Sequence, residues 1–124
     1  NALPFYTSMW TVADAVWEHE AVAPFDSNGH PVDYVIEEVQ TLPMQQAIDA
    51  AKSHSNAVTV FDETTKQNYV EWSNGNRKTM MWLEDATSLE AKLQVMKERN
   101  IAGVAVWQLG YGEPFAWEVI SKYY

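Results

Sequence analysis

Hydrophobic and polar positions change their spacing along the chain in a way that predicts strands in some segments and helices in others. Runs rich in β-branched and aromatic residues predict strands at residues 3–6, 34–40, 57–61, 68–72, 77–83 and 101–109. Apolar residues at helical spacing predict helices at about residues 43–53, 87–99 and 115–123. The segment 7–20 has mixed spacing and is predicted as loop or irregular helix, whereas 24–31, with two Pro and an Asn-Gly pair, is typical of a loop.

An Asn-Gly pair at positions 74 and 75 lies between two of these strands. Asn and Gly tolerate the positive φ that a type I′ turn requires at both central residues, so the pair predicts a two-residue hairpin loop. In that register Glu71 lies opposite Lys78, which places an ion pair across the strands. Tyr69 then lies opposite Met80, and this packing pair favours the same register.

Two signals in the C-terminal third indicate a helix followed by a buried strand. Thr87, with Glu90 three residues later, matches a capping box at a helix start. Asn100 is suited to the left-handed conformation that ends a helix. The run IAGVAVWQL at 101–109 is nearly all apolar, which is typical of a strand covered on both faces in a parallel α/β sheet.

The composition is that of a globular domain with an acidic surface. The chain has 124 residues, 47% of them hydrophobic, which is enough for one domain with a buried core. Eight Lys and Arg against seventeen Asp and Glu give a net charge of -9, so we expect neither nucleic acid nor a membrane surface as a partner. No apolar run approaches the roughly 18 residues of a membrane span.

The residue types for several kinds of chemistry are absent or unsuitably spaced. The chain has no Cys, which excludes disulfides, thiolate metal sites and cysteine nucleophiles. It has no phosphate-binding loop or dinucleotide fingerprint, and we expect no cofactor. It has three histidines, His19, His30 and His54, and they lack the spacing of metal ligands. We therefore expect no metal. The acidic pairs at 62–63 and 84–85 lie at turn or helix-entry positions, and we interpret them as solvated carboxylates.

Aromatic residues are the unusual feature of the composition. Six Trp and six Tyr supply flat apolar faces with polar edges, which suit stacking on sugar rings. Trp is also a large core residue. Composition alone therefore leaves a sugar-contacting role and a core-packing role open for each Trp.

One stretch near the C-terminus carries a motif of specific residues at specific spacing. Its positions are Trp82, Glu84, Asp85, Ser88, Leu89, Lys92, Gly103 and Trp107. The run that contains them, MMWLEDATSLEAKLQVMKERNIAGVAVWQLGYGEPFAW, resembles the end of the catalytic barrel of glycoside hydrolase family 18, the chitinase-like family, in its bacterial envelope and spore-cortex branch. The N-terminal LPFYTSMW looks like the seventh barrel strand of that family.

This resemblance implies an α+β fold that contains the last βα units of a (β/α)8 TIM-type barrel and the small α+β insertion domain of family 18 glycosidases. In this assignment residues 1–124 form a single fragment domain. Its parts are barrel-derived strands and a helix at 3–20 and 101–124, the insertion at 33–83 and a barrel helix at 86–100. A complete barrel needs about 250 residues, so we expect a parent protein that extends upstream.

The resemblance also implies a hydrolase, a glycosidase of N-acetylglucosamine-containing β-1,4 glycans such as peptidoglycan or chitin, located in a bacterial cell envelope or spore or outside the cell. Trp107 matches the Trp that ends the eighth barrel strand and floors the subsite of the reacting sugar. Tyr6 and Trp10 match positions that follow the seventh strand. These three are the expected substrate-binding residues, whereas we expect Trp72 and Trp82 to be packing residues or an outer cleft wall.

The catalytic residues of the family are missing from this chain. The signature DxxDxDxE occurs nowhere in the 124 residues, so we predict no catalytic residue and no hydrolysis by this portion alone. Two other functions stay open, namely a stand-alone carbohydrate-binding or interaction module and a structural domain whose Trp residues are all core. The strands at 3–6 and 101–109 would leave unpaired edges, so we also expect a homodimer or a strand-exchanged oligomer.

Overall fold

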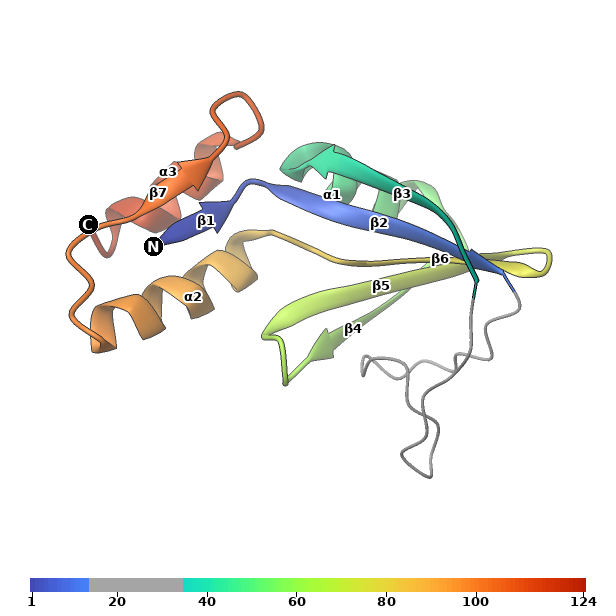
Figure 1. Cartoon of the computed structure of the whole chain (residues 1–124), viewed down its shortest axis with the longest axis horizontal. Helices are drawn as coiled ribbons and strands as arrows, with labels where there is room; N and C mark the ends of the chain where they lie inside the picture. Colours follow the sequence, from blue (N-terminus) through green and yellow to red (C-terminus); the bar gives the residue numbers. More distant parts are fainter. Residues whose placement is uncertain (14–34) are drawn as a thin grey trace.

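The computed structural model describes residues 1–13 and 35–124, which form two sheets and three helices (Figure 1). In chain order the elements are β1 (Ala2–Pro4), β2 (Tyr6–Ala13), β3 (Val35–Pro43), α1 (Met44–Ser53), β4 (Val58–Asp62), β5 (Gln67–Asn74), β6 (Arg77–Trp82), α2 (Ala86–Glu98), β7 (Ala105–Trp107) and α3 (Pro114–Ser121). The predicted α+β class is confirmed. The loop expected at 24–31, together with His19 and His30, lies outside the described residues.

Strands β1 and β7 form a small parallel sheet with two different faces. Leu3 pairs with Val106, and both belong to the face that packs against α2 and α3. Pro4 pairs with Trp107, and both belong to the opposite face. The expected strand at 101–109, covered on both sides, is therefore wrong in length and in burial. In the described part of the chain, helices cover one face of β7 only, and Trp107 is exposed on the other.

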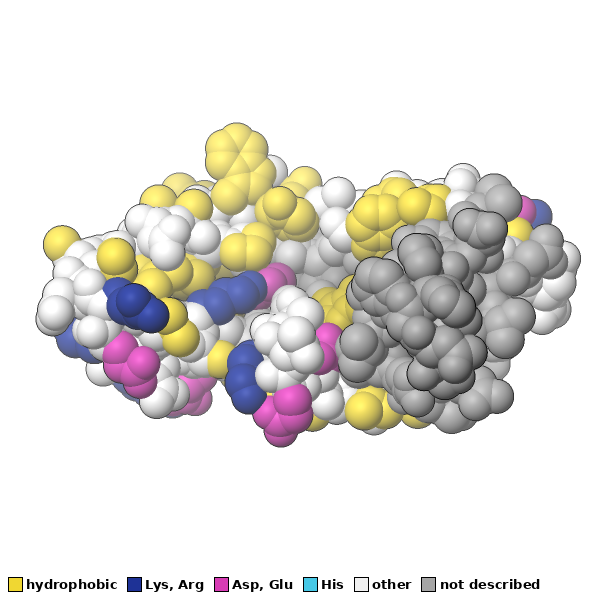
Figure 2. Space-filling view, turned by 60° about the horizontal axis from the view of Figure 1, so that its bottom comes forward, with side chains coloured by type: hydrophobic (Ala, Val, Ile, Leu, Met, Phe, Trp, Pro, Cys, Tyr) yellow, Lys and Arg dark blue, Asp and Glu magenta, His cyan; other side chains and the backbone are white. Residues whose placement is uncertain are grey.

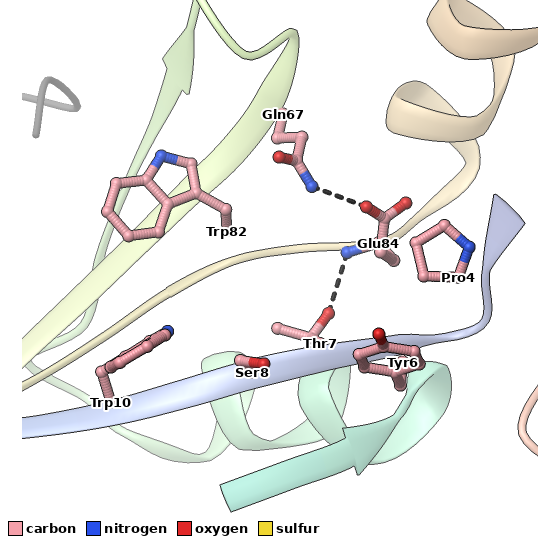
Figure 3. Close-up of a pocket in the computed structure, with 8 residues that line it drawn as sticks. All are labelled: Pro4, Tyr6, Thr7, Ser8, Trp10, Gln67, Trp82 and Glu84. Carbon is pink, nitrogen blue, oxygen red and sulfur yellow. Dashed lines mark hydrogen bonds between the residues drawn. The ribbon is translucent and has the colours of Figure 1, made fainter. Parts of the chain in front are cut away.

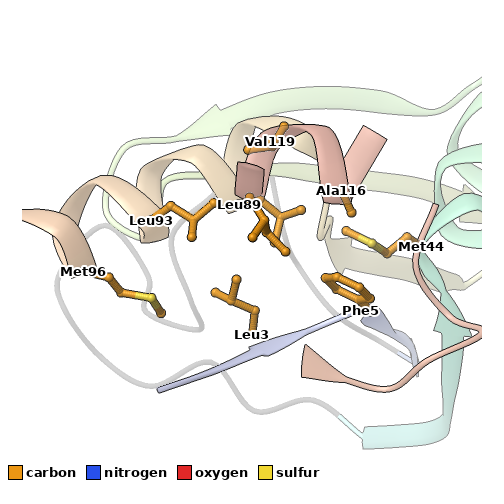
Figure 4. Packing of buried hydrophobic residues seen from close by; sticks show 9 residues of the cluster. Leu3, Phe5, Met44, Leu89, Leu93, Met96, Ala116 and Val119 are labelled. Carbon is orange, nitrogen blue, oxygen red and sulfur yellow. The ribbon is translucent and has the colours of Figure 1, made fainter. Parts of the chain in front are cut away.

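The largest hydrophobic core lies between this small sheet and the helices α2 and α3 (Figure 4). Its buried residues are Leu3, Phe5, Met44, Leu89, Leu93, Met96, Ala116, Val119 and Ile120. The chain bends at Phe5, whose side chain is fully buried. The predicted strand at 3–6 is consequently divided, because Tyr6 already belongs to β2.

The second sheet has five antiparallel strands in the order β3-β2-β6-β5-β4. Strand β2 lies between β3 and β6, so the prediction of loop or irregular helix from residue 7 onward is wrong as far as Ala13. The periodicity misled because β2 packs side chains on both faces of the sheet. Met9 contacts the core on the α1 side, whereas Trp10 and Val12 contact a separate cluster on the other side.

Helix α1 covers one face of the five-stranded sheet, as its predicted apolar stripe requires. Ala47 of α1 packs with Trp72 and Met81 of the sheet in this second core. Trp72 is 7% exposed, which confirms the packing role expected for it. The indole ring of Trp72 also stacks on the imidazole ring of His54, with 4.0 Å between the ring centroids.

The hairpin between β5 and β6 forms with a register two positions away from the predicted one. Asn74 pairs with Arg77, so the two-residue loop is Gly75-Asn76 and not Asn74-Gly75. Only Gly75 has a positive φ in this loop, as a type II′ turn requires at its first central residue. The expected pairing of Glu71 with Lys78 is therefore wrong, because Glu71 pairs with Met80. Lys78 is a diagonal neighbour on the adjacent strand, and its Nζ still lies 3.4 Å from Glu71 Oε1.

Helix α2 begins one residue earlier than the sequence predicts, with a different capping box. Asp85 is the N-cap, and its Oδ1 accepts a hydrogen bond of 3.0 Å from the backbone N–H of Ser88. Ser88 Oγ accepts one of the same length from the N–H of Asp85. The expected box of Thr87 and Glu90 is wrong because Asp85 takes the cap position first. Asn100 has a φ of 55°, which confirms it as the left-handed end of the helix.

We expect Gly112→Ala to destabilise the fold by about 1–3 kcal/mol, because a Cβ at this position would overlap the buried ring of Phe5. Gly103→Ala is the matched control, since nothing lies within 4 Å of a Cβ there, and it should change stability by less than about 0.5 kcal/mol. Urea unfolding of both variants measures the difference. Equal free energies of unfolding would contradict the packing of Gly112 on Phe5.

Candidate functional site

A shallow hollow of about 190 Å³ opens where the small sheet meets the five-stranded sheet (Figure 3). Four segments supply its lining: the end of β1, the first half of β2, the start of β5 and the end of β6 with the residues that follow it. The lining residues are Pro4, Tyr6, Thr7, Ser8, Trp10, Gln67, Trp82 and Glu84. Aromatic faces, neutral polar groups and one carboxylate, that of Glu84, therefore converge on one small cavity.

Two indole rings form one end of the hollow. Trp10 pairs with Met80 across β2 and β6, and Trp82 follows Met80 by two residues, so both indoles lie on the same face of the sheet. Figure 3 shows them at one end of the hollow, with Pro4 and Tyr6 at the other. The structure thus brings the predicted site residues Tyr6 and Trp10 together and adds Trp82, which was expected to be a packing residue or an outer wall.

Asp62 fixes the orientation of the Trp82 ring. Trp82 Nε1 donates a hydrogen bond of 2.9 Å to Asp62 Oδ2, while Asp62 Oδ1 accepts one of 2.9 Å from the N–H of Thr64. Burial raises the pKa of Asp62, but hydrogen bonds from Thr65, Trp82 and Thr64 outweigh it and hold the pKa below its ordinary value. The interpretation of Asp62 as a solvated carboxylate is wrong, since it is 4% exposed.

Glu84 lies at the back of the hollow and is also buried, at 5% exposure. Its carboxylate accepts hydrogen bonds from Gln67 Nε2 at 2.8 Å, from Ser88 Oγ at 2.9 Å and from Lys92 Nζ. Burial raises the pKa of Glu84, and the opposing effects of Lys92 and Ser88 do not cancel the rise. The interpretation of Glu84 as a solvated carboxylate is therefore wrong as well.

Trp107 lies beside the hollow. It shares a face of the small sheet with its register partner Pro4, which lines the hollow, and the backbone N–H of Phe5 donates a hydrogen bond of 2.7 Å to the carbonyl of Trp107. The side chain of Trp107 is 64% exposed. The third predicted site residue thus shares a sheet face with Pro4, at the end of the hollow where Tyr6 lies, and its side chain is exposed.

Sequence reasoning missed Gln67 and misread Glu84. A signal for Glu84 was present in the sequence. Ser88 and Lys92 follow it by four and eight residues, and this spacing places both on the side of α2 that faces Glu84. No local pattern pointed to Gln67. Its partners, Leu83 and Glu84, are sixteen and seventeen residues away in sequence and meet it only in the folded sheet.

Within residues 1–13 and 35–124, no three His, Cys, Asp or Glu side chains are grouped as metal ligands would be. The helices among these residues are all too short or too polar to cross a bilayer.

Comparison with protein families gives a match to "Glycosyl hydrolases family 18" over residues 2–112. The cortical fragment-lytic enzyme of Bacillus subtilis is 29% identical over 107 residues, which are 86% of this chain and 23% of that protein. Chitinase ChiA of Flavobacterium johnsoniae is 28% identical over 103 residues, which are 83% of this chain and 6% of that protein. The chain spans less than a quarter of the length of these curated relatives.

Solved structures share the fold over nearly the whole chain. The spore cortex-lytic enzyme SleL of Bacillus megaterium is similar with a TM-score of 0.70 and 22% identity, covering 99% of this chain and 24% of that one. A chitinase from Chromobacterium violaceum has a TM-score of 0.68 and 15% identity, covering 98% of this chain and 31% of that one.

We expect Lys92→Met to raise the pKa of Glu84 further, because the variant loses the positive charge that favours the carboxylate. A carboxyl whose folded-state pKa is raised loses stability as the pH rises through that pKa. The free energy of unfolding of Lys92→Met should therefore fall below that of the native chain as the pH rises, and approach it again below the ordinary value of 4.5.

Carboxyl ¹³C NMR titration measures this pKa, and urea unfolding at a series of pH values measures the stability. Lys52→Met is the control, since Lys52 lies on α1 and makes no contact with Glu84. An unchanged Glu84 pKa in Lys92→Met would contradict the ion pair.

Proposed function

The chain belongs to glycosyl hydrolase family 18, and from this premise we propose that it is the C-terminal, non-catalytic portion of an enzyme acting on N-acetylglucosamine-containing β-1,4 glycans, either peptidoglycan or chitin. In this proposal it contributes an aromatic wall of the sugar cleft. The observation that carries it is the exposed ring of Trp107 beside a hollow lined by Tyr6 and Trp10. The names of the relatives support a place of action in a spore, the cell envelope or outside the cell.

The chemistry of the surface suits a pyranose ring. A sugar has apolar C–H faces and a rim of hydroxyl groups, and such ligands bind where aromatic faces lie next to a few polar groups. Trp107 offers a face in the open, whereas Trp10 and Tyr6 lie in the hollow next to the hydroxyl groups of Thr7 and Ser8.

The buried carboxylates of Asp62 and Glu84 do not have the properties of a catalytic acid. A general acid needs a raised pKa and a proton free to reach the leaving oxygen. Asp62 has a lowered pKa, and Glu84 is engaged by Lys92, Ser88 and Gln67. Together with the missing DxxDxDxE signature, this supports a binding role without catalysis for this portion.

We assign the small sheet and its helices to the barrel of the parent enzyme. β1 and β7 are parallel and are covered by α2 and α3 on one face, as strands of a (β/α)8 barrel are. The antiparallel sheet with α1 corresponds in this assignment to the insertion domain. Strand β2, which the sequence placed in the barrel-derived part at 3–20, then belongs to the insertion, because it pairs with β3 and β6. The family match supports the assignment, since it covers both parts of the chain.

Sugar binding should be weak, in the millimolar range at best, because an open wall leaves most hydroxyl groups of the sugar in water. We expect chitotriose to shift the indole N–H signal of Trp107 in ¹H–¹⁵N NMR spectra, and Trp107→Ala to weaken binding at least about tenfold. Trp117→Ala is the control, as Trp117 is 45% exposed on α3 and packs on Phe5 away from the hollow.

Two results would contradict the proposal. Absence of any shift at Trp107, Trp10 and Tyr6 at high chitotriose concentration would remove the sugar-contacting role and favour a structural domain. Micromolar binding that is abolished in Trp107→Ala would instead favour the alternative of a stand-alone carbohydrate-binding module.

We also propose that two copies of the chain associate through the end of the molecule that carries β7, α2 and α3. Hydrophobic side chains reach the surface there (Figure 2), and β1 and β7 pair with no further strand among the described residues. Apart from Trp107, which the proposal assigns to the sugar, the large exposed hydrophobic residues at this end are Val95, Leu109, Trp117 and Tyr124.

Sedimentation over a series of protein concentrations should therefore show a dimer that dissociates on dilution. Leu109→Ser should weaken it, because Leu109 is 77% exposed. Ile36→Ser, at an exposed site on β3, is the control and should leave the dimer unchanged. A monomer at the highest concentration would contradict the association.

A further inference from the structure

The side-chain amide of Gln67 has a fixed orientation. Its Nε2 donates to the carbonyl oxygen of Leu83 at 3.3 Å and to Glu84 Oε1 at 2.8 Å. Both partners are acceptors, and the backbone carbonyl is an acceptor at every pH. Rotating the amide by 180° would place the Gln67 oxygen against two other oxygens, so only one orientation is favourable.

In this orientation the carbonyl oxygen of Gln67 faces the hollow. Figure 3 shows the amide nitrogen directed at Glu84 and the oxygen turned toward Trp82. Among the residues that the structure describes, no donor lies within hydrogen-bond distance of Gln67 Oε1. The hollow therefore has one oriented acceptor between its indole end, with Trp10 and Trp82, and its Tyr6 end.

The group behind Gln67 is itself held in place. Glu84 accepts from Ser88 Oγ at 2.9 Å and from Lys92 Nζ, while its backbone N–H donates to Thr7 Oγ1 at 2.9 Å. Contacts to β2, β5 and α2 thus fix a carboxylate that is 5% exposed. An amide held by such a network is already oriented before a ligand arrives, which lowers the cost of ordering it on binding.

We propose that Gln67 Oε1 determines specificity in this hollow by accepting a hydrogen bond from a neutral donor on a pyranose ring, with Glu84 as the positioning residue behind it. This inference rests on the proposed function, because it concerns the same sugar-contacting surface. The donor is an O–H or an acetamido N–H of the sugar. A carboxylate on the sugar at this point is disfavoured, since it has only acceptors to offer and lies close to the charge of Glu84.

The test is titration of the 124-residue chain with chitotriose, followed through the indole N–H signals of Trp10 and Trp82. Gln67→Met keeps the length of the side chain and removes the acceptor, so we expect binding roughly three- to tenfold weaker with an unchanged folded spectrum. Gln94→Met is the matched control, because Gln94 also donates to a glutamate, Glu98, but on the exposed side of α2. Its affinity should equal that of the native chain.

A second sugar identifies the donor. Cellotriose carries a hydroxyl group where chitotriose carries the acetamido group. If cellotriose also loses affinity in Gln67→Met, a hydroxyl group suffices as the donor and the acetamido N–H is not required. If only chitotriose loses affinity, the donor is the acetamido N–H. Equal affinity of Gln67→Met and the native chain for chitotriose would overturn the role of Gln67.

Glu84→Gln separates positioning from a general structural effect. If Glu84 acts on the sugar through Gln67, then Glu84→Gln weakens chitotriose binding in the native chain but has no further effect in Gln67→Met. Additive losses would overturn the positioning role. Failure of the proposed function gives a different result, because all indole signals, including that of Trp107, would then stay unshifted in the native chain.

Discussion

The position of helix α2 on the five-stranded sheet depends on the contacts of one buried residue, Glu84. It accepts hydrogen bonds from Gln67 of β5 and from Lys92 of α2, and its own N–H donates to Thr7 of β2. An ionised group is tolerated at such burial only when it is paired and hydrogen-bonded. The same contacts therefore hold α2 against the five-stranded sheet, next to the hollow that Tyr6 and Trp10 line.

Most of the fold could be predicted from local patterns. The errors arise where strand pairing or burial depends on residues far away in the sequence. The hairpin of β5 and β6 was expected, but its register depends on which residue takes a positive φ, and the choice of Gly75 over Asn74 as the first loop residue comes from pairing along the whole strand. Strand β2 was missed because it has a different core on each face. Burial on both sides removes the alternation that identifies a strand.

The aromatic residues of the candidate site could be predicted, because each depends on one residue type at one position in the sequence. Tyr6, Trp10 and Trp107 came from the resemblance to family 18. Tyr6 and Trp10 line one hollow, and Trp107 pairs with Pro4, which also lines it. Gln67 and Glu84 were beyond local reasoning, since their roles come from partners on other elements and from burial. A carboxylate just before a helix is ordinarily solvated. Glu84 is buried only because α2 packs against the sheet.

We propose that the contacts of Glu84 hold the aromatic and polar side chains of the hollow in the positions that a sugar ring requires. A crystal structure of the chain with chitotriose is the decisive measurement. We expect a pyranose ring stacked on Trp107 or between the indoles of the hollow, with a donor of the sugar on Gln67 Oε1 and the Glu84 contacts unchanged. Chitotriose bound elsewhere, with the hollow closed or its side chains rearranged, would contradict it.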